Sequence, residues 1–84
     1  MIEPRFKVRC ENSRFKEEQY ICVQYKGKYF PLYERVCVTL LDSIQVVGDL
    51  YWIYDDCLDL LVEDLRIRIS YIQIKSISKI QELR

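Results

Sequence analysis

The sequence predicts a mainly β domain: a small barrel of about five strands, preceded by an additional N-terminal strand and hairpin. The chain is rich in Ile, Val and Tyr, which fit the pleated surface of strands. Several segments alternate apolar and polar residues with the period of two that is typical of half-buried strands. One long apolar run contains a lone glycine, Gly48, and a strand that bends at a glycine allows a small sheet to curl into a barrel.

The N-terminal third predicts a strand followed by a hairpin. Residues 5–10 alternate basic and apolar side chains, which indicates a half-buried strand with its basic side chains outward. Gly27 lies between two aromatic-rich runs, 20–25 and 29–33, and glycine supplies the positive φ that a tight hairpin turn needs. Since Pro31 has no backbone N–H, we expect the returning strand to be short or at an edge of its sheet.

The whole chain, residues 1–84, is expected to form a single domain. Residues 1–34 are assigned to the N-terminal strand and hairpin, and residues 35–80 to the barrel core. Alternating or apolar segments that predict strands in this core are residues 36–41, 46–54, 66–69 and 71–74. Residues 55–65 fit the spacing of a helix and the alternation of a strand equally well, so both interpretations stay open.

A stretch in the second half carries a family resemblance. Residues 38–50 contain alternating apolar residues, an Asp42-Ser43 turn and an apolar-x-Gly-x-Leu bend, and they resemble the first motif of Sm-like proteins, the family that includes Hfq and the Lsm proteins. Residues 55–64 are similar to the Asp-x-x-x-Asn-Leu-x-Leu stretch of that motif, with one extra residue before them. The second motif is matched only by isoleucines: Ile67, Ile69, Ile72, Ile74 and Ile77. The resemblance covers residues 36–77 and implies an SH3-like or Sm-like barrel that tends to form rings.

The RNA site of that family does not carry over. The family's loop asparagine, which contacts RNA bases, falls at Asp59, and its base-stacking position falls near Cys57. Its turn glycine is Ser43 here, and Ser70-Tyr71 replaces the usual Arg-Gly or Lys-Gly pair. Because an acidic loop repels phosphate and cysteine offers no stacking face, we expect the uracil pocket to be absent.

The charge of the chain is balanced but unevenly distributed. A formal net charge of zero excludes strong non-specific attraction of the whole molecule to a nucleic-acid backbone. Residues 1–35 carry eight Lys and Arg against five acids, whereas residues 36–84 carry five against eight. Residues 49–64 contain six acids and no basic residue. Head-to-tail association, a basic face for an acidic partner, and an ordinary solvated surface of mixed charge all remain open.

Several active-site chemistries are excluded by composition. The chain has no His, and hence no imidazole base and no His-based metal site. The adjacent acids Asp55-Asp56 and Glu63-Asp64 are expected to be solvated rather than catalytic, because neighbouring residues of a strand point to opposite faces. We therefore expect no enzyme activity, no cofactor and no metal.

The four cysteines favour a reducing compartment. Cys10, Cys22, Cys37 and Cys57 stand at gaps without the C-x-x-C spacing of a zinc site. The N-terminus has no apolar signal region, and no run is long enough to cross a membrane. We expect four free thiols in a cytoplasmic protein, with two disulfides as the alternative.

Aromatic and basic residues supply the candidate binding site. Tyr51, Trp52 and Tyr54 lie on one predicted strand and make both of its faces aromatic or apolar, so one face needs cover from residues 20–34 or from a partner. A second set could form a basic stripe with an aromatic neighbour: Arg66, Arg68 and Tyr71. For this stripe a solvated β-surface is favoured over contact with RNA.

These observations predict a non-catalytic protein-interaction or regulatory module that self-associates. One alternative is a single-stranded RNA- or DNA-binding protein of the Sm-like or OB-like type. Another is a small inhibitor from a phage or other mobile element that docks on a host enzyme, for which the charge asymmetry is suitable. The expected partner is a protein, either a second copy or another chain, with no membrane contact.

Overall fold

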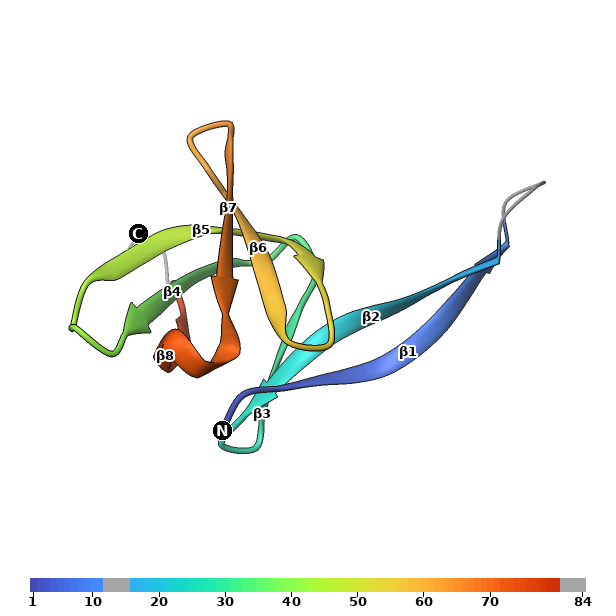
Figure 1. Cartoon of the computed structure of the whole chain (residues 1–84), viewed down its shortest axis with the longest axis horizontal. Helices are drawn as coiled ribbons and strands as arrows, with labels where there is room; N and C mark the ends of the chain where they lie inside the picture. Colours follow the sequence, from blue (N-terminus) through green and yellow to red (C-terminus); the bar gives the residue numbers. More distant parts are fainter. Residues whose placement is uncertain (12–15, 81–84) are drawn as a thin grey trace.

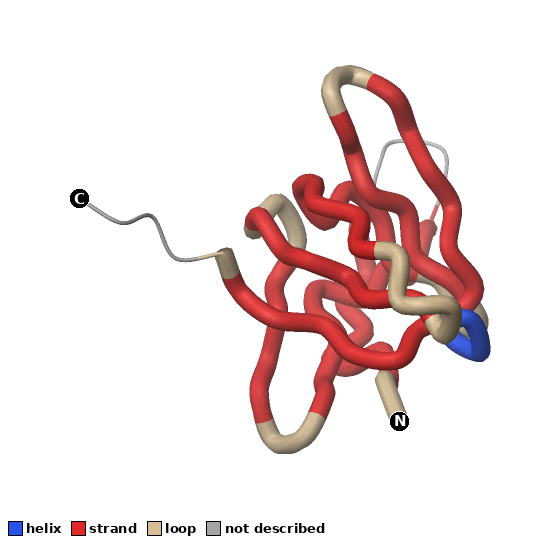
Figure 2. The backbone as a smooth tube through the Cα atoms, turned by 90° about the vertical axis from the view of Figure 1, so that its left-hand side faces the viewer, coloured by secondary structure: helices blue, strands red, loops and turns tan. Residues whose placement is uncertain are grey.

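The computed structural model describes residues 1–11 and 16–80, and these form two antiparallel sheets (Figure 1). The first has the order β1-β2-β3, with β1 Glu3–Glu11, β2 Lys16–Tyr25 and β3 Lys28–Pro31. The second has the order β7-β6-β5-β4-β8, with β4 Arg35–Leu40, β5 Gln45–Ile53, β6 Cys57–Val62, β7 Leu65–Ser70 and β8 Ile74–Lys79. A 3-10 turn, η1 (Tyr71–Gln73), is the blue segment in Figure 2. The mainly β class is confirmed.

The five-stranded sheet decides between helix and strand for residues 55–65, and it leaves the predicted barrel unconfirmed. Residues 55–65 do not form a helix: they comprise a bend at 55–56, strand β6, a turn at 63–64 and the first residue of β7. Within the described ranges, no ladder joins the edge strands β7 and β8, so a closed barrel is not found. In the same ranges, no helix is long and apolar enough to cross a membrane.

The first sheet contains the predicted N-terminal strand and hairpin. The expected half-burial of residues 5–10 is wrong, because the apolar side chains of Phe6 and Val8 are exposed like the basic ones between them. β1 pairs with β2, and the two form a ribbon that extends away from the second sheet (Figure 1). β2 and β3 are joined by Lys26 and Gly27, whose φ angles of 49° and 76° are both positive, as a tight hairpin turn requires. β3 lies at the edge of its sheet and ends at Pro31, so the expectation for this strand is confirmed.

Both sheets contribute to one hydrophobic core. From the first sheet and the residue before it come Ile2, Val23 and Phe30. From the second sheet come Val36, Val38, Leu50, Ile53, Leu58, Leu60, Ile69 and Ile77. Backbone bonds join the two parts: the Tyr33 N–H donates to the Leu50 carbonyl at 2.6 Å, and the Leu50 N–H donates to the Glu34 carbonyl at 2.9 Å. The N-terminal sheet thus completes the core of the second sheet.

Gly48 lies in β5 against the end of the neighbouring strand β6. A Cβ atom added to Gly48 would lie 2.7 Å from the carbonyl oxygen of Leu61 and 2.8 Å from Cγ2 of Val62. Real Cβ atoms do not approach backbone so closely, so only glycine fits this position without a shift of β6. The physical reason for this glycine is the close approach of another strand.

One predicted strand is wrong. Residues 71–74 alternate like a strand, but Tyr71–Gln73 form η1 and only Ile74 begins β8. The Ser70 N–H donates to the side-chain oxygen of Gln73 at 3.2 Å, and the Tyr71 N–H donates to the Asp56 carbonyl at 3.0 Å. Local side-chain bonding of this kind competes with a strand ladder, and here it reverses the chain before β8.

Candidate functional site

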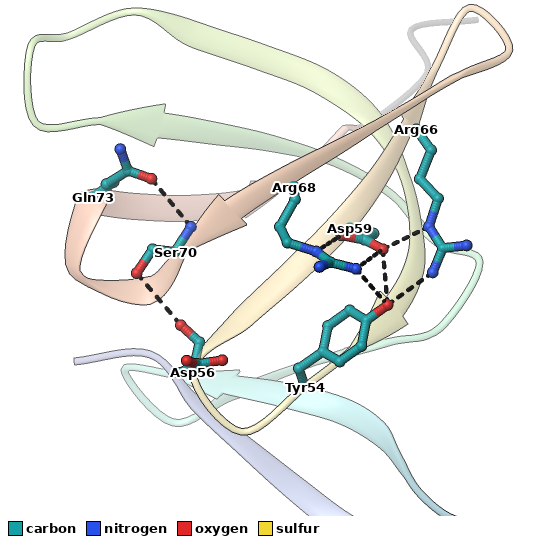
Figure 3. Close-up of polar contacts among 7 residues, drawn as sticks. All are labelled: Tyr54, Asp56, Asp59, Arg66, Arg68, Ser70 and Gln73. Atoms are coloured by element: carbon teal, nitrogen blue, oxygen red, sulfur yellow. Dashed lines mark hydrogen bonds and ion pairs between the residues drawn. The ribbon is translucent and has the colours of Figure 1, made fainter.

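A cluster of charged and aromatic side chains lies on one face of the β6–β7 hairpin, beside the turn that follows β5 (Figure 3). Arg66 and Arg68 share this face because side chains two apart on a strand point the same way. Asp59 in β6 pairs with Arg68 across the β6–β7 hairpin and with Trp52 on the other side. Tyr54 follows β5 directly, in a tight turn closed by its N–H donating to the Cys57 carbonyl at 2.9 Å.

Asp59 is the centre of this cluster and is only 1% exposed. Nε of Arg66 donates to its Oδ2 at 2.6 Å, and Nε of Arg68 donates to its Oδ1 at 3.0 Å. The Tyr54 hydroxyl donates to Oδ2 at 3.1 Å and accepts from Nη2 of each arginine at 2.8 Å. Every oxygen of the cluster is therefore hydrogen-bonded, which allows a carboxylate to be buried.

The two arginines also stack on tyrosine rings. The guanidinium of Arg66 lies 4.8 Å from the ring centre of Tyr51, and that of Arg68 lies 4.5 Å from the ring centre of Tyr54. Both arginine side chains stay accessible, at 47% and 60% exposure. With one carboxylate against two guanidiniums, the cluster keeps one net positive charge at the surface. We call Tyr51, Tyr54, Arg66 and Arg68 the Arg–Tyr face.

The charged state of the cluster is strongly favoured. Burial raises the pKa of Asp59, but hydrogen bonds from Arg68, Arg66 and Tyr54 outweigh burial and bring the pKa below its ordinary value. The hydrogen bond to Asp59 raises the pKa of both Arg66 and Arg68. Asp59 is thus ionised at neutral pH, and it holds both guanidiniums in place.

A β-bulge decides which aromatic side chains face outward. The pairing of β5 with β6 shifts register between Leu50 and Trp52, so Tyr51 is an extra residue in β5. Strict alternation would put Leu50 and Trp52 on one face and Ile53 on the other. The bulge instead lets Leu50 and Ile53 both enter the core, while Tyr51 and Trp52 lie outside it.

The N-terminal hairpin covers part of this aromatic segment. A groove of about 400 Å³ separates the ribbon from the β5–β6 turn, and Trp52 lines it together with Tyr20 and Lys7. The Tyr20 hydroxyl donates to Oδ1 of Asp55 at 2.6 Å, which ties β2 to this turn. Trp52 is half-buried there, whereas Tyr51 stays 37% exposed.

Of the six residues predicted from the sequence, four therefore meet on the Arg–Tyr face, and Trp52 lies beside it. Tyr71 is not part of this face, because it packs against the core: its hydroxyl donates to the backbone carbonyl of Tyr54 at 2.7 Å, and burial raises its pKa. The sequence interpretation missed the role of Asp59. A signal was present, because a hairpin turn at Glu63-Asp64 places Asp59 opposite Arg68.

The fold and site define a small, mainly β protein with an arginine–tyrosine surface around a buried carboxylate. Comparison with protein-family models, with curated proteins and with solved structures gives no match for this chain. The function must therefore be inferred from its own side chains.

Proposed function

We propose that the chain is a non-catalytic interaction module that binds a protein partner through the Arg–Tyr face, with a second copy of the chain as the first candidate. The observation that carries this proposal is the pair of exposed guanidiniums held on tyrosine rings by buried Asp59. Tyr, Trp and Arg are enriched at the energetic centres of protein interfaces. Because Asp59 and Tyr54 already fix both arginines, little side-chain entropy remains to be lost on binding.

The arginines retain donors for a partner. Their contacts with Asp59 and Tyr54 use Nε and Nη2, and Nη1 of each makes no hydrogen bond to any residue in the ranges 1–11 and 16–80. Guanidinium groups bind carboxylates in two-point geometry. A partner that presents Asp or Glu is therefore favoured, and the exposed acids Asp56, Glu63 and Asp64 make a second copy suitable.

The proposal includes the shape of the second sheet, which we take as a small SH3-like or Sm-like barrel. The close contact of β6 with Gly48 of β5 and the apolar side chains enclosed by five strands favour strong curvature. The family's RNA pocket is not part of the proposal, since Asp59 is occupied by its two arginines.

Changing Tyr51 to Ser is expected to weaken self-association roughly 30-fold, because an aromatic anchor contributes about 2 kcal/mol at an interface centre. Sedimentation equilibrium over a concentration series, at low and high salt, measures this change. The wild type should associate less as salt rises. Tyr29→Ser is the matched control, since Tyr29 is also exposed but lies in β3 of the other sheet. If the wild type stays monomeric and captures no lysate protein that Tyr51→Ser loses, the proposal is wrong.

A single-stranded nucleic acid is the second candidate ligand. The structure interleaves Arg66 and Arg68 with Tyr51 and Tyr54, and stacked cations of this kind suit bases and phosphates. Salt-dependent retention of a fluorescent single-stranded oligonucleotide by the wild type, lost in Arg66→Lys, would favour this candidate. A small inhibitor that docks on a host enzyme would be one form of the protein-binding module.

We also propose a cytoplasmic location, on account of the cysteines. Cys22, Cys37 and Cys57 are free, Cys22 and Cys37 are buried, and the side chain of Cys10 lies outside the described part. Burial raises the pKa of the thiols of Cys22 and Cys57, which slows their reaction with alkylating reagents.

The corresponding expectation is four alkylated thiols in the unfolded protein without any reductant, and slow labelling of Cys22 and Cys37 in the folded one. Intact-mass spectrometry after alkylation, with and without urea, counts them. A stoichiometric disulfide or a bound zinc ion would overturn both the thiol count and the proposed compartment.

A further inference from the structure

A second concave surface lies where the two sheets meet, on elements other than those of the Arg–Tyr face. It is a groove of about 390 Å³ between the β2–β3 turn and the segment formed by η1 and the start of β8. Its lining includes the apolar side chains Ile2, Tyr25, Ile72 and Ile74 and the basic side chains Lys26 and Lys75. Grooves of this size, apolar with a few placed polar groups, are typical ligand sites.

Ile72 is the most unusual residue of this groove. It is 83% exposed, although it is a large aliphatic side chain next to an apolar concavity. Its position is rigid, because the Ser70 N–H bonds to the Gln73 side chain and the neighbouring Tyr71 is held at both its N–H and its hydroxyl. With its backbone held, Ile72 loses only the rotamer freedom of its own side chain when it contacts a partner.

The charges of the groove indicate the chemistry of its ligand. Lys26 and Lys75 are its charged lining residues, and no acid lines it. The side chain of Tyr25 lies between them: Nζ of Lys26 is 5.5 Å from its ring centre, and its hydroxyl donates to the Lys75 carbonyl at 3.2 Å. The two positive charges lie on separate elements of the fold. They therefore suit a peptide with carboxylates on either side of an apolar side chain better than a lipid with a single anionic headgroup.

We propose that this groove binds an acidic peptide segment of a partner protein, in which a large apolar side chain packs against Ile72 and Tyr25 while neighbouring Asp or Glu carboxylates meet Lys26 and Lys75. The surface does not depend on the Arg–Tyr face, so the protein can hold two partners or two parts of one partner. The groove and the Arg–Tyr face have no residue in common. A test can therefore contradict the binding of a peptide in the groove without contradicting the proposed function of the Arg–Tyr face, and the reverse.

The test is a selection of displayed random peptides on the immobilised wild-type protein, followed by binding titrations of the enriched peptides. Enriched sequences should carry a large apolar residue within two positions of Asp or Glu. Ile72→Asp and Lys75→Glu should each weaken their binding at least tenfold, while Ile44→Asp and Tyr51→Ser leave it unchanged. Ile44 is an exposed aliphatic residue before β5 and serves as the matched control for Ile72.

Circular dichroism is used first to check that each variant folds. We expect folding to be retained, because the side chains of Ile72 and Lys75 are exposed. Amide shifts of the wild type with one enriched peptide then locate the site, and they should centre on Tyr25, Ile72 and Ile74. The inference is overturned if no peptide is enriched, if enriched peptides lack acids, if Ile72→Asp binds them as well as the wild type does, or if the shifts centre on the Arg–Tyr face.

Discussion

Replacing Gly48 with Val is expected to lower the free energy of unfolding by about 3 kcal/mol. The added Cβ would overlap the carbonyl oxygen of Leu61 and Cγ2 of Val62, so β6 has to move away from β5. Since the closest atom belongs to the backbone, no side-chain rotation relieves the overlap. For a domain of this size the loss corresponds to roughly 15 °C in melting temperature, which circular dichroism measures.

The matched control is the other glycine. Gly27 has a φ of 76° and no atom within 4 Å of an added Cβ, so Gly27→Ala should lose only about 1 kcal/mol through backbone strain. Gly48→Ala carries the same Cβ overlap as the valine variant with less bulk, and it can be measured if the valine variant does not fold. Equal losses in Gly48→Ala and Gly27→Ala would contradict the close contact between Gly48 and β6.

Asp59→Asn is expected to destabilise the protein by about 2–3 kcal/mol, because it removes the charge that binds two guanidiniums and sets an amide N–H₂ against their donors. The expected loss of stability is smaller than that for a fully buried ion pair, because both arginines are partly exposed and can be hydrated in the variant. Asp49→Asn is the control: Asp49 pairs with exposed Arg35 at 3.3 Å, and the loss there should stay below about 1 kcal/mol. Urea unfolding at neutral pH compares the two variants.

The pH dependence supplies a second measurement on Asp59. Its pKa in the folded protein lies below the ordinary value, so its carboxylate stabilises the fold above about pH 4. That contribution is lost as the pH falls from about 4 through the lower pKa of the folded state. The difference in stability between wild type and Asp59→Asn should therefore be constant from pH 5 to 8 and shrink in stronger acid. A difference that stays constant in acid would show that folding does not lower the pKa of Asp59.

The sequence predicted the elements whose evidence is local. The alternation of residues 5–10 and 66–69 corresponds to strands β1 and β7, and the Lys26-Gly27 turn joins β2 to β3. Alternation reports the side chains of one strand, and a turn needs only its own backbone angles, so neither depends on distant residues. The same reasoning failed at residues 71–74, where side-chain bonding at Ser70 and Gln73 formed η1 instead.

The sequence predicted part of the candidate site, namely the residues that can be recognised by their type alone. Tyr51, Tyr54, Arg66 and Arg68 were chosen by residue type, and the structure gathers them on one face. Asp59 was not chosen, because residues 55–65 fitted a helix as well as a strand. Once β6 is a strand that pairs with β7, the carboxylate lies against both arginines.

By itself, therefore, the sequence determined the mainly β class and the hairpin at Gly27, which follow from local pattern and turn chemistry. The need for glycine at position 48 comes from contact with β6 and so belongs to the tertiary structure. Only the tertiary structure decided which side of the aromatic strand faces the core. That choice depends on the bulge at Tyr51, which brings Leu50 and Ile53 inside together. A bulge is a feature of the pairing between two strands, so its position depends on how β5 pairs with β6 and cannot be predicted from the sequence of one strand alone.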